Sequence, residues 1–170
     1  MTWVDYAVIA VLGVSALLGI WRGFIREVLA LAGWIAAGVI AVMFAPEGAA
    51  LLPQDFATPL VRHLLAAALV FVLVLVVAGL AGLLLSKLVR AVGLGALDRT
   101  LGGVFGFVRG ALIVLVAVLL VGVTSLPREP AWREAQLRGP LETAAIAARA
   151  YLPEAIAERI RYDEPEVGAR

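Results

Sequence analysis

Four apolar segments, each close to the length that crosses a lipid bilayer, constrain this chain more than any other feature. They cover residues 3–21, 28–45, 64–86 and 101–123. A spanning helix needs about 20 mainly apolar residues, because hydrocarbon offers no partner to backbone N–H and C=O groups. We therefore predict an all-α fold: a polytopic membrane protein with four transmembrane helices and a short, partly helical polar C-terminal tail.

The composition excludes several other classes of protein. Of the 170 residues, 63% are hydrophobic and 16% are charged, with a mean hydropathy of +1.02. About a quarter of the residues are charged in an ordinary soluble domain. A net charge of +1 speaks against nucleic acid as a partner. The absence of Cys excludes disulfides, thiolate metal sites and cysteine nucleophiles.

Charge divides the chain into two parts. Residues 1–124 carry 7 basic and 5 acidic side chains, whereas residues 125–170 carry 7 basic and 8 acidic ones. We expect a transmembrane domain over 1–125 and a polar tail over 126–170. The tail has segments with helical spacing up to residue 161 and a disordered end from 163 to 170. Whether it is an interfacial or partner-binding helix pair or a solvated appendage stays open.

Basic residues in the short loops predict the orientation. Five of them belong to the first and third loops, and only Arg62 belongs to the second. Lys and Arg accumulate in cytoplasmic loops. We therefore expect the first and third loops in the cytoplasm and both termini outside it. Arg128, Arg133 and Arg138, which follow the fourth helix closely, weaken this expectation.

Proline and glycine predict where the helices end. Pro46, Pro53 and Pro59 are expected to break the second loop into short pieces. Gly93 is placed to terminate the third helix, and Asp98 to act as N-cap of the fourth.

Residues that could support catalysis are scarce. His63 is the only histidine, no G-x-S-x-G motif occurs, and metal ligands at useful spacing are absent. The acidic residues of the apolar domain lie at helix ends or in loops, which does not support a proton relay through the membrane. We expect no enzymatic activity, no catalytic residue, no metal and no cofactor.

A charged layer near one membrane face is the first candidate site. It comprises one short loop and the start of the fourth helix: Arg22, Gly23, Arg26, Glu27, Asp98 and Arg99. Arg109 lies about eight residues inside that helix, where an unpaired cation is costly. We hypothesise that Arg109 pairs with Glu27 or Asp98; the alternative is that its side chain reaches the interface on its own.

Glycines form the second candidate site. Gly102, Gly106 and Gly110 recur every four residues, with Gly103 beside them. Small residues at this spacing mark faces where membrane helices approach closely. The pattern does not distinguish packing within the chain from contact with another copy. Gly79 and Gly82 on the third helix are a candidate partner surface.

At these residues the chain resembles the colicin V production protein family. Three stretches carry the resemblance: Asp5-Tyr6; Arg22-Gly23-Phe24-Ile25-Arg26-Glu27 followed by Trp34-Ile35-Ala36-Ala37; and Asp98-Arg99-Thr100-Leu101-Gly102-Gly103 running into Gly106-Phe107-Val108-Arg109-Gly110. It covers roughly residues 1–125. The resemblance implies a four-helix protein of the bacterial inner membrane with a role in toxin production or export and in envelope homeostasis.

Two functions follow as hypotheses. In the first, the protein is a non-enzymatic assembly factor that acts through packing on its glycine face. Its partners are then the lipid bilayer and either further copies or proteins of an export machinery. In the second, it is a subunit of a small oligomeric channel or transporter, with Arg22, Arg26, Arg99 and Arg109 around a cytoplasmic mouth.

Overall fold

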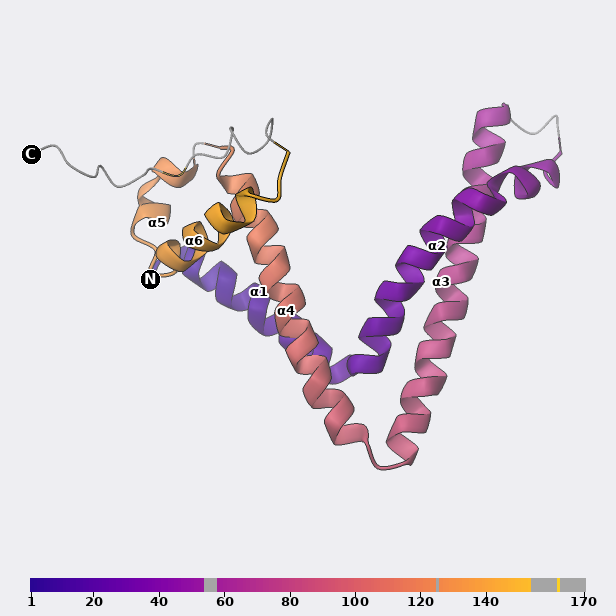
Figure 1. Ribbon diagram of the computed structural model, residues 1–170, viewed down its shortest axis with the longest axis horizontal. Helices are drawn as coiled ribbons and strands as arrows, with labels where there is room; N and C mark the ends of the chain where they lie inside the picture. The colour runs from indigo at the N-terminus through magenta and orange to yellow at the C-terminus, as the bar shows by residue number, and fades with distance from the viewer. Residues whose placement is uncertain (54–57, 125, 154–161, 163–170) are drawn as a thin grey trace, which may run out of the picture. The chain divides into compact units, whose positions relative to one another are not determined.

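Every regular element of the computed structural model is a helix in the part that it describes, which comprises residues 1–53, 58–124, 126–153 and 162. Four long helices are followed by three short ones (Figure 1). The elements are α1 (Trp3–Arg22), α2 (Phe24–Ala50), α3 (Pro59–Ala91), α4 (Gly95–Val121), η1 (Leu126–Arg128), α5 (Pro130–Arg133) and α6 (Arg138–Arg149). The expected all-α class with four long apolar helices and a short tail is confirmed.

All four long helices are long and apolar enough to cross a membrane. They contain 20, 27, 33 and 27 residues. At 1.5 Å per residue, the 33 residues of α3 extend about 50 Å, which exceeds a hydrocarbon core of about 30 Å. Helix α3 is therefore longer than a perpendicular crossing of the apolar layer requires.

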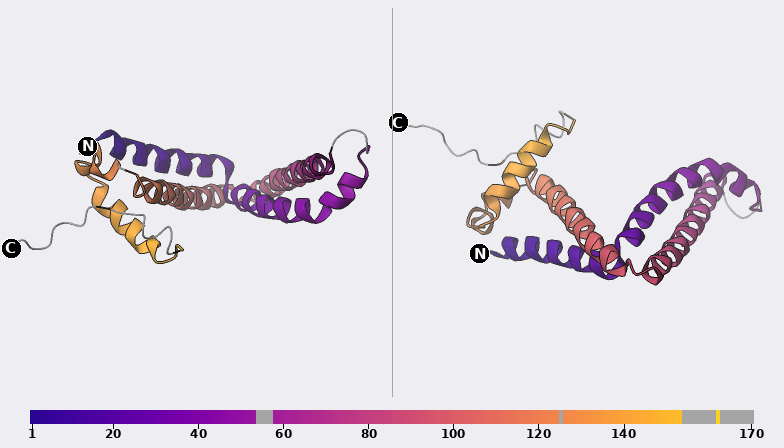
Figure 2. Two further views of the ribbon diagram at one scale, coloured as in Figure 1. Left: turned by 90° about the horizontal axis from the view of Figure 1, so that it is seen from above. Right: turned by 60° about the horizontal axis from the view of Figure 1, so that its bottom comes forward.

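The chain divides into two compact units, which we describe separately. One comprises residues 1–18 and 106–170, and the other comprises residues 19–105. The 19–105 unit is dominated by α2 and α3, which run side by side in every view (Figures 1 and 2). Gly82 lies against Leu29, and Gly48 lies against Ala66, so the two helices are antiparallel.

The partner of Gly82 differs from the one expected. A Cβ at Gly82 would lie 3.7 Å from the Leu29 side chain on α2, and a Cβ at Gly79 would meet nothing within 4 Å. The candidate surface on α3 therefore packs partly against α2 and does not serve the glycines of α4. Helices adjacent in sequence and joined by a short connection pair readily.

The 1–18 and 106–170 unit has its core between the N-terminal part of α1, the C-terminal part of α4 and the tail. Valines from α1 and α4 meet tail residues in one buried cluster: Val4, Val8, Val114, Val118, Trp132, Ala135 and Ala145. Helix α6 lies beside α4 in Figures 1 and 2, with Leu141 packed against this cluster. The described tail therefore packs on its own chain through these residues, whereas others, such as Ile146, are exposed.

The glycines of α4 pack against α1. Gly102 approaches the carbonyl oxygen of Gly19, and Gly106 approaches that of Ser15. Gly110 follows beside Leu12, so α1 and α4 are antiparallel. Whether the glycine face serves packing within the chain or contact between copies was left open by the sequence; here it serves packing within the chain.

Two helix boundaries differ from expectation. The predicted six-residue first loop is replaced by one residue, Gly23, because α1 continues to Arg22 and α2 starts at Phe24. Helix α2 also continues through Pro46 to Ala50, so the second loop is shorter than predicted. Proline lacks an N–H and disfavours helix interiors, but here only one turn of helix follows it.

Other boundary predictions are confirmed or lie outside the described residues. Gly93 adopts the left-handed conformation (φ +84°) after α3, as expected of a helix terminator. Pro59 occupies the first turn of α3. The predicted last helix over 154–161 and the disorder over 163–170 lie outside the described residues.

We predict that Gly106→Ala destabilises the protein, whereas Gly13→Ala does not. A Cβ at Gly106 would meet the backbone of Ser15 and Ala16, which cannot move without displacing α1; a Cβ at Gly13 would meet nothing within 4 Å. Overpacking of this kind costs about 1–3 kcal/mol. Thermal denaturation in detergent measures the difference, and equal midpoints for the two variants would contradict close α1–α4 packing.

Candidate functional site

Asp98 caps the start of α2. Its Oδ1 accepts a hydrogen bond of 3.0 Å from the backbone N–H of Ile25, and its side chain is almost fully buried, at 5% exposure. Helix N-termini leave N–H groups without intrahelical partners and favour a negative charge. The N-cap residue of α2 is Gly23, which has no side chain to supply an acceptor. The expected role of Asp98 is therefore corrected: it lies in the first turn of α4 and caps α2.

Only glycine fits at position 23 beside the Asp98 carboxylate. The φ of +88° at Gly23 falls in the left-handed region, which residues with a Cβ rarely adopt. A Cβ at this position would also collide with the Asp98 carboxylate. The Gly23 backbone and the Asp98 side chain therefore form one joint between α1, α2 and α4.

Aromatic and charged contacts surround the joint. The rings of Phe24 and Phe105 meet edge to face, with centroids 5.8 Å apart. Arg22 and the buried Glu27 form an ion pair of 3.4 Å. A Cβ at Gly103 would lie 2.7 Å from the side chain of Ile20, so this glycine too allows close approach of α1 and α4.

Four arginines line one hollow in the 19–105 unit, together with an aromatic ring. We call this the arginine hollow; it is lined by Trp21, Arg22, Arg26, Arg90 and Arg99. The residues come from the end of α1, the start of α2, the end of α3 and the start of α4. Of the residues expected in the charged layer, Arg22, Arg26 and Arg99 line the hollow, whereas Gly23, Glu27 and Asp98 do not. Arg90, which was counted only toward the orientation, belongs to it.

Arg109 lies in the other unit and is held by α1. Its Nε donates to the hydroxyl of Ser15 at 3.1 Å, and its Nη2 donates to the Ser15 carbonyl at 3.2 Å. The Ser15 hydroxyl in turn donates to the carbonyl of Gly106 at 2.7 Å. The hypothesised ion pair of Arg109 with Glu27 or Asp98 stays a prediction. No sequence pattern singled out Ser15, although a hydroxyl inside an apolar segment is a usable signal of a polar contact between helices.

Asp5 organises the tail. Its side chain is fully buried (0% exposed), with Oδ1 accepting the N–H of Leu137 at 2.9 Å. Its Oδ2 accepts the N–H of Gln136 at 3.2 Å and that of Thr2 at 2.8 Å. One carboxylate thus satisfies backbone groups at both the start of α1 and the joint between α5 and α6. The sequence showed Asp5 at the outer end of the first segment but not this role.

Tyr162, the last described residue of the tail, packs against the buried cluster that contains Val118 and Trp132. Tyr162 stacks on Trp132, with ring centroids 6.4 Å apart, and its hydroxyl donates to the Val118 carbonyl. Burial raises the pKa of Tyr162 to about 12, and the nearby charge of Glu142 adds to the shift. Glu142 also accepts a hydrogen bond of 2.8 Å from the Trp132 indole.

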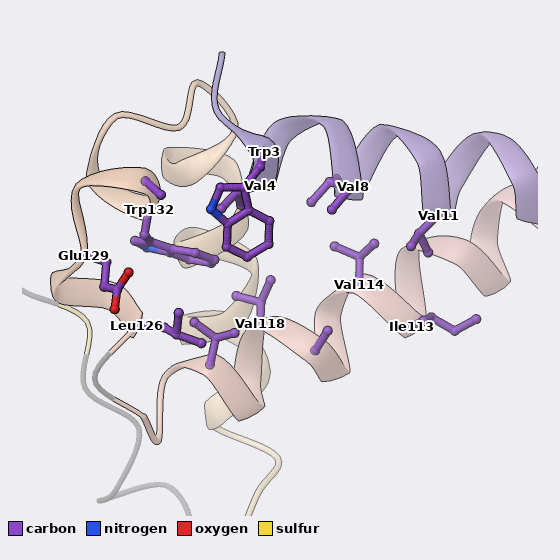
Figure 3. A pocket seen from close by; sticks show the side chains of 14 residues that line it. Trp3, Val4, Val8, Val11, Ile113, Val114, Val118, Leu126, Glu129 and Trp132 are labelled. Carbon is purple, nitrogen blue, oxygen red and sulfur yellow. The ribbon is translucent and has the colours of Figure 1, made fainter.

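An apolar groove lies between α1, α4 and the tail (Figure 3). Val8 of α1 and Val114 of α4 face each other across it, and the indoles of Trp3 and Trp132 lie toward one end. Glu129 is the one acidic side chain among its lining residues. Its walls therefore suit apolar groups, whereas the arginine hollow suits anions.

Within the described ranges, no group of three or more His, Asp or Glu side chains is placed to hold a metal ion. The buried carboxylates of Asp5 and Asp98 accept backbone N–H groups instead.

Comparison with known sequences identifies the family. The sequence model of the colicin V production protein family matches residues 4–146. The chain belongs to this family. The chain is 40% identical to the colicin V production protein homolog of Haemophilus influenzae over 135 residues, which cover 79% of this chain and 82% of that protein. It is 36% identical to the colicin V production protein of Escherichia coli over 138 residues, covering 81% and 85% of the two chains. No solved structure matches the chain.

The family match confirms the resemblance and extends it. The motifs that carry the resemblance fall in residues 1–125, but the match continues to residue 146. It therefore includes Gln136 and Leu137, whose N–H groups bind Asp5, and most of α6.

We predict that Asp5→Ala releases the tail joint. The change leaves the N–H groups of Gln136 and Leu137 without their acceptor, which costs about 2 kcal/mol for bonds to a charged group. Limited digestion with trypsin at Arg133 and Arg138 should become faster. Glu47→Ala, at an exposed carboxylate, is the matched control; equal cleavage rates for the two variants would contradict the role of Asp5.

Proposed function

We propose that this protein acts in colicin V production as a non-enzymatic assembly factor of the bacterial inner membrane. Its similarity to the Haemophilus influenzae and Escherichia coli proteins over about four fifths of the chain carries the proposal. The factor works by contact with lipid and with other membrane proteins, either further copies or an export machinery.

The environment of the acidic groups supports a structural role over a catalytic one. Asp5 and Asp98 hold backbone N–H groups, and Glu27 pairs with Arg22. A general base must reach a proton on a bound substrate. These three carboxylates are instead buried and engaged in holding helices together.

Contacts with other proteins would use surfaces other than the glycine face. Helix α1 already covers the α4 glycines. Large apolar side chains are exposed along α2, α3 and α4, among them Val42, Leu73 and Phe107. In a membrane these side chains face lipid or a neighbouring helix.

We predict that the chain restores colicin V production to a producing Escherichia coli strain that lacks its own colicin V production protein. Growth inhibition of a sensitive strain measures secreted toxin. A photoreactive residue at Phe107, which is 52% exposed, should form crosslinks to protein, whereas one at the fully buried Ala37 should form none between chains.

The complementation, crosslinking and liposome experiments contradict different parts of the proposal. Failure to restore toxin, with the protein present in the membrane, would contradict the role in colicin V production. Restoration with crosslinks to lipid alone would contradict assembly. Ion flux through liposomes that contain the purified protein would favour the channel alternative.

We propose further that the arginine hollow faces the cytoplasm and that both termini lie outside it. The gathering of Arg22, Arg26, Arg90 and Arg99 in one hollow supports this orientation, because Lys and Arg concentrate on the cytoplasmic side.

The orientation predicts two opposite labelling patterns. The natural chain has no Cys, so single cysteines can be introduced. A membrane-impermeant thiol reagent should label Glu134→Cys in intact spheroplasts, and Leu94→Cys only after the membrane is opened; both positions are exposed. The reverse pattern would overturn the orientation.

A further inference from the structure

We infer that the arginine hollow binds the phosphate group of an anionic phospholipid. The hollow draws residues from the ends of four helices, so its geometry is set by the packing of the 19–105 unit and not by one flexible loop. Its volume of about 210 Å³ far exceeds the roughly 15 Å³ needed for a single water.

Among the described residues, three of the four arginines in the hollow have no acidic partner. As far as the structure describes the chain, the lining contains four guanidinium groups and no carboxylate. Of these, Arg22 has Glu27 as its partner. Within the described residues, Arg26, Arg90 and Arg99 have no carboxylate at ion-pair distance. Like charges in one hollow repel each other, so a bound anion would stabilise this arrangement.

Arg26 and Arg90 have N–H groups that are available to a bound anion. The buried Nε of Arg26 has no hydrogen-bond partner in the described chain. Arg90 donates to the hydroxyl and carbonyl oxygens of the buried Ser86, at 2.8 and 3.2 Å, which fixes its guanidinium without neutralising it. A buried donor without an acceptor is costly. A ligand with several oxygens would supply acceptors to more than one arginine.

Phosphate fits this set of donors best. Guanidinium presents a planar fork of N–H groups that matches the oxygens of phosphate. The carboxylates that could compete, Glu27 and Asp98, are already engaged by Arg22 and by the Ile25 N–H.

Trp21 indicates that the phosphate belongs to a lipid. Its indole lines the hollow while 80% of the residue is exposed. Tryptophan concentrates at the depth of lipid headgroups. The hollow is also bounded by the ends of apolar helices, which brings it to the same depth. Basic pockets between transmembrane helices are known sites for anionic headgroups. The assignment does not depend on a role in colicin V production.

The test measures lipid binding to the purified full chain in a neutral detergent. Native mass spectrometry and the shift of the thermal midpoint follow titration with phosphatidylglycerol, phosphatidylcholine or inorganic phosphate. We expect phosphatidylglycerol to bind more tightly than phosphatidylcholine, which carries no net charge, and more tightly than inorganic phosphate.

Variants locate the site. Arg26→Gln and Arg99→Gln should each weaken phosphatidylglycerol binding by about 10- to 100-fold, as expected for one charge-assisted hydrogen bond. Arg26→Lys should be intermediate, because it keeps the charge and loses the fork. Lys87→Gln removes an exposed charge near the same end of α3 but outside the hollow, and should bind like the natural chain.

The outcomes separate the explanations. Equal binding of the two lipids, or equal losses in Lys87→Gln and the arginine variants, would overturn the site and leave the arginines as signals of orientation only. Inorganic phosphate binding as tightly as the lipid would overturn the lipid assignment. Arg99 is exposed, so Arg99→Gln should fold even if Arg26→Gln does not. If neither variant folds, the comparison of phosphatidylglycerol with phosphatidylcholine on the natural chain still tests anionic lipid binding.

Discussion

Close backbone contact between α1 and α4 is the interaction on which the rest of the structure depends. Lipid tails are as apolar as leucine, so membrane helices gain little from burying apolar side chains and associate through packing and polar contacts. Gly102 and Gly106 bring α4 within reach of the carbonyl oxygens of Gly19 and Ser15. At that separation the Ser15 hydroxyl can reach the Gly106 carbonyl, and Arg109 can reach Ser15.

Two aspartates extend the same principle to the helix ends. Where the chain turns sharply, backbone N–H groups lose their helical partners, and in an apolar setting each such group needs another acceptor. Asp98 supplies one for α2, and Asp5 supplies one for the joint between α5 and α6. Both acceptors come from residues distant in sequence. They therefore tie elements together while satisfying groups that the turns expose.

The arginine hollow differs from these joints because, among the described residues, three of its four guanidinium groups have no carboxylate partner. Glu27 follows Arg26 in the sequence and Asp98 precedes Arg99, yet these two carboxylates bind Arg22 and the Ile25 N–H. The remaining guanidiniums face a polar space at the helix ends. Hydrogen bonds from backbone N–H groups to buried carboxylates hold the helices together. The arginines without an acidic partner give this end of the 19–105 unit its affinity for anions.

The sequence by itself determined the four apolar helices, the polar tail and the family, because helix length and hydropathy are local properties and the two charged motifs are contiguous. It also indicated Gly23, Asp98 and the α4 glycines as a site. Only the tertiary structure decided what these residues contact: Asp98 caps α2, the glycines meet α1, and Asp5 holds the tail. The physical reason is that a carboxylate or a glycine face has many equivalent partners along a chain, and three-dimensional proximity alone selects among them.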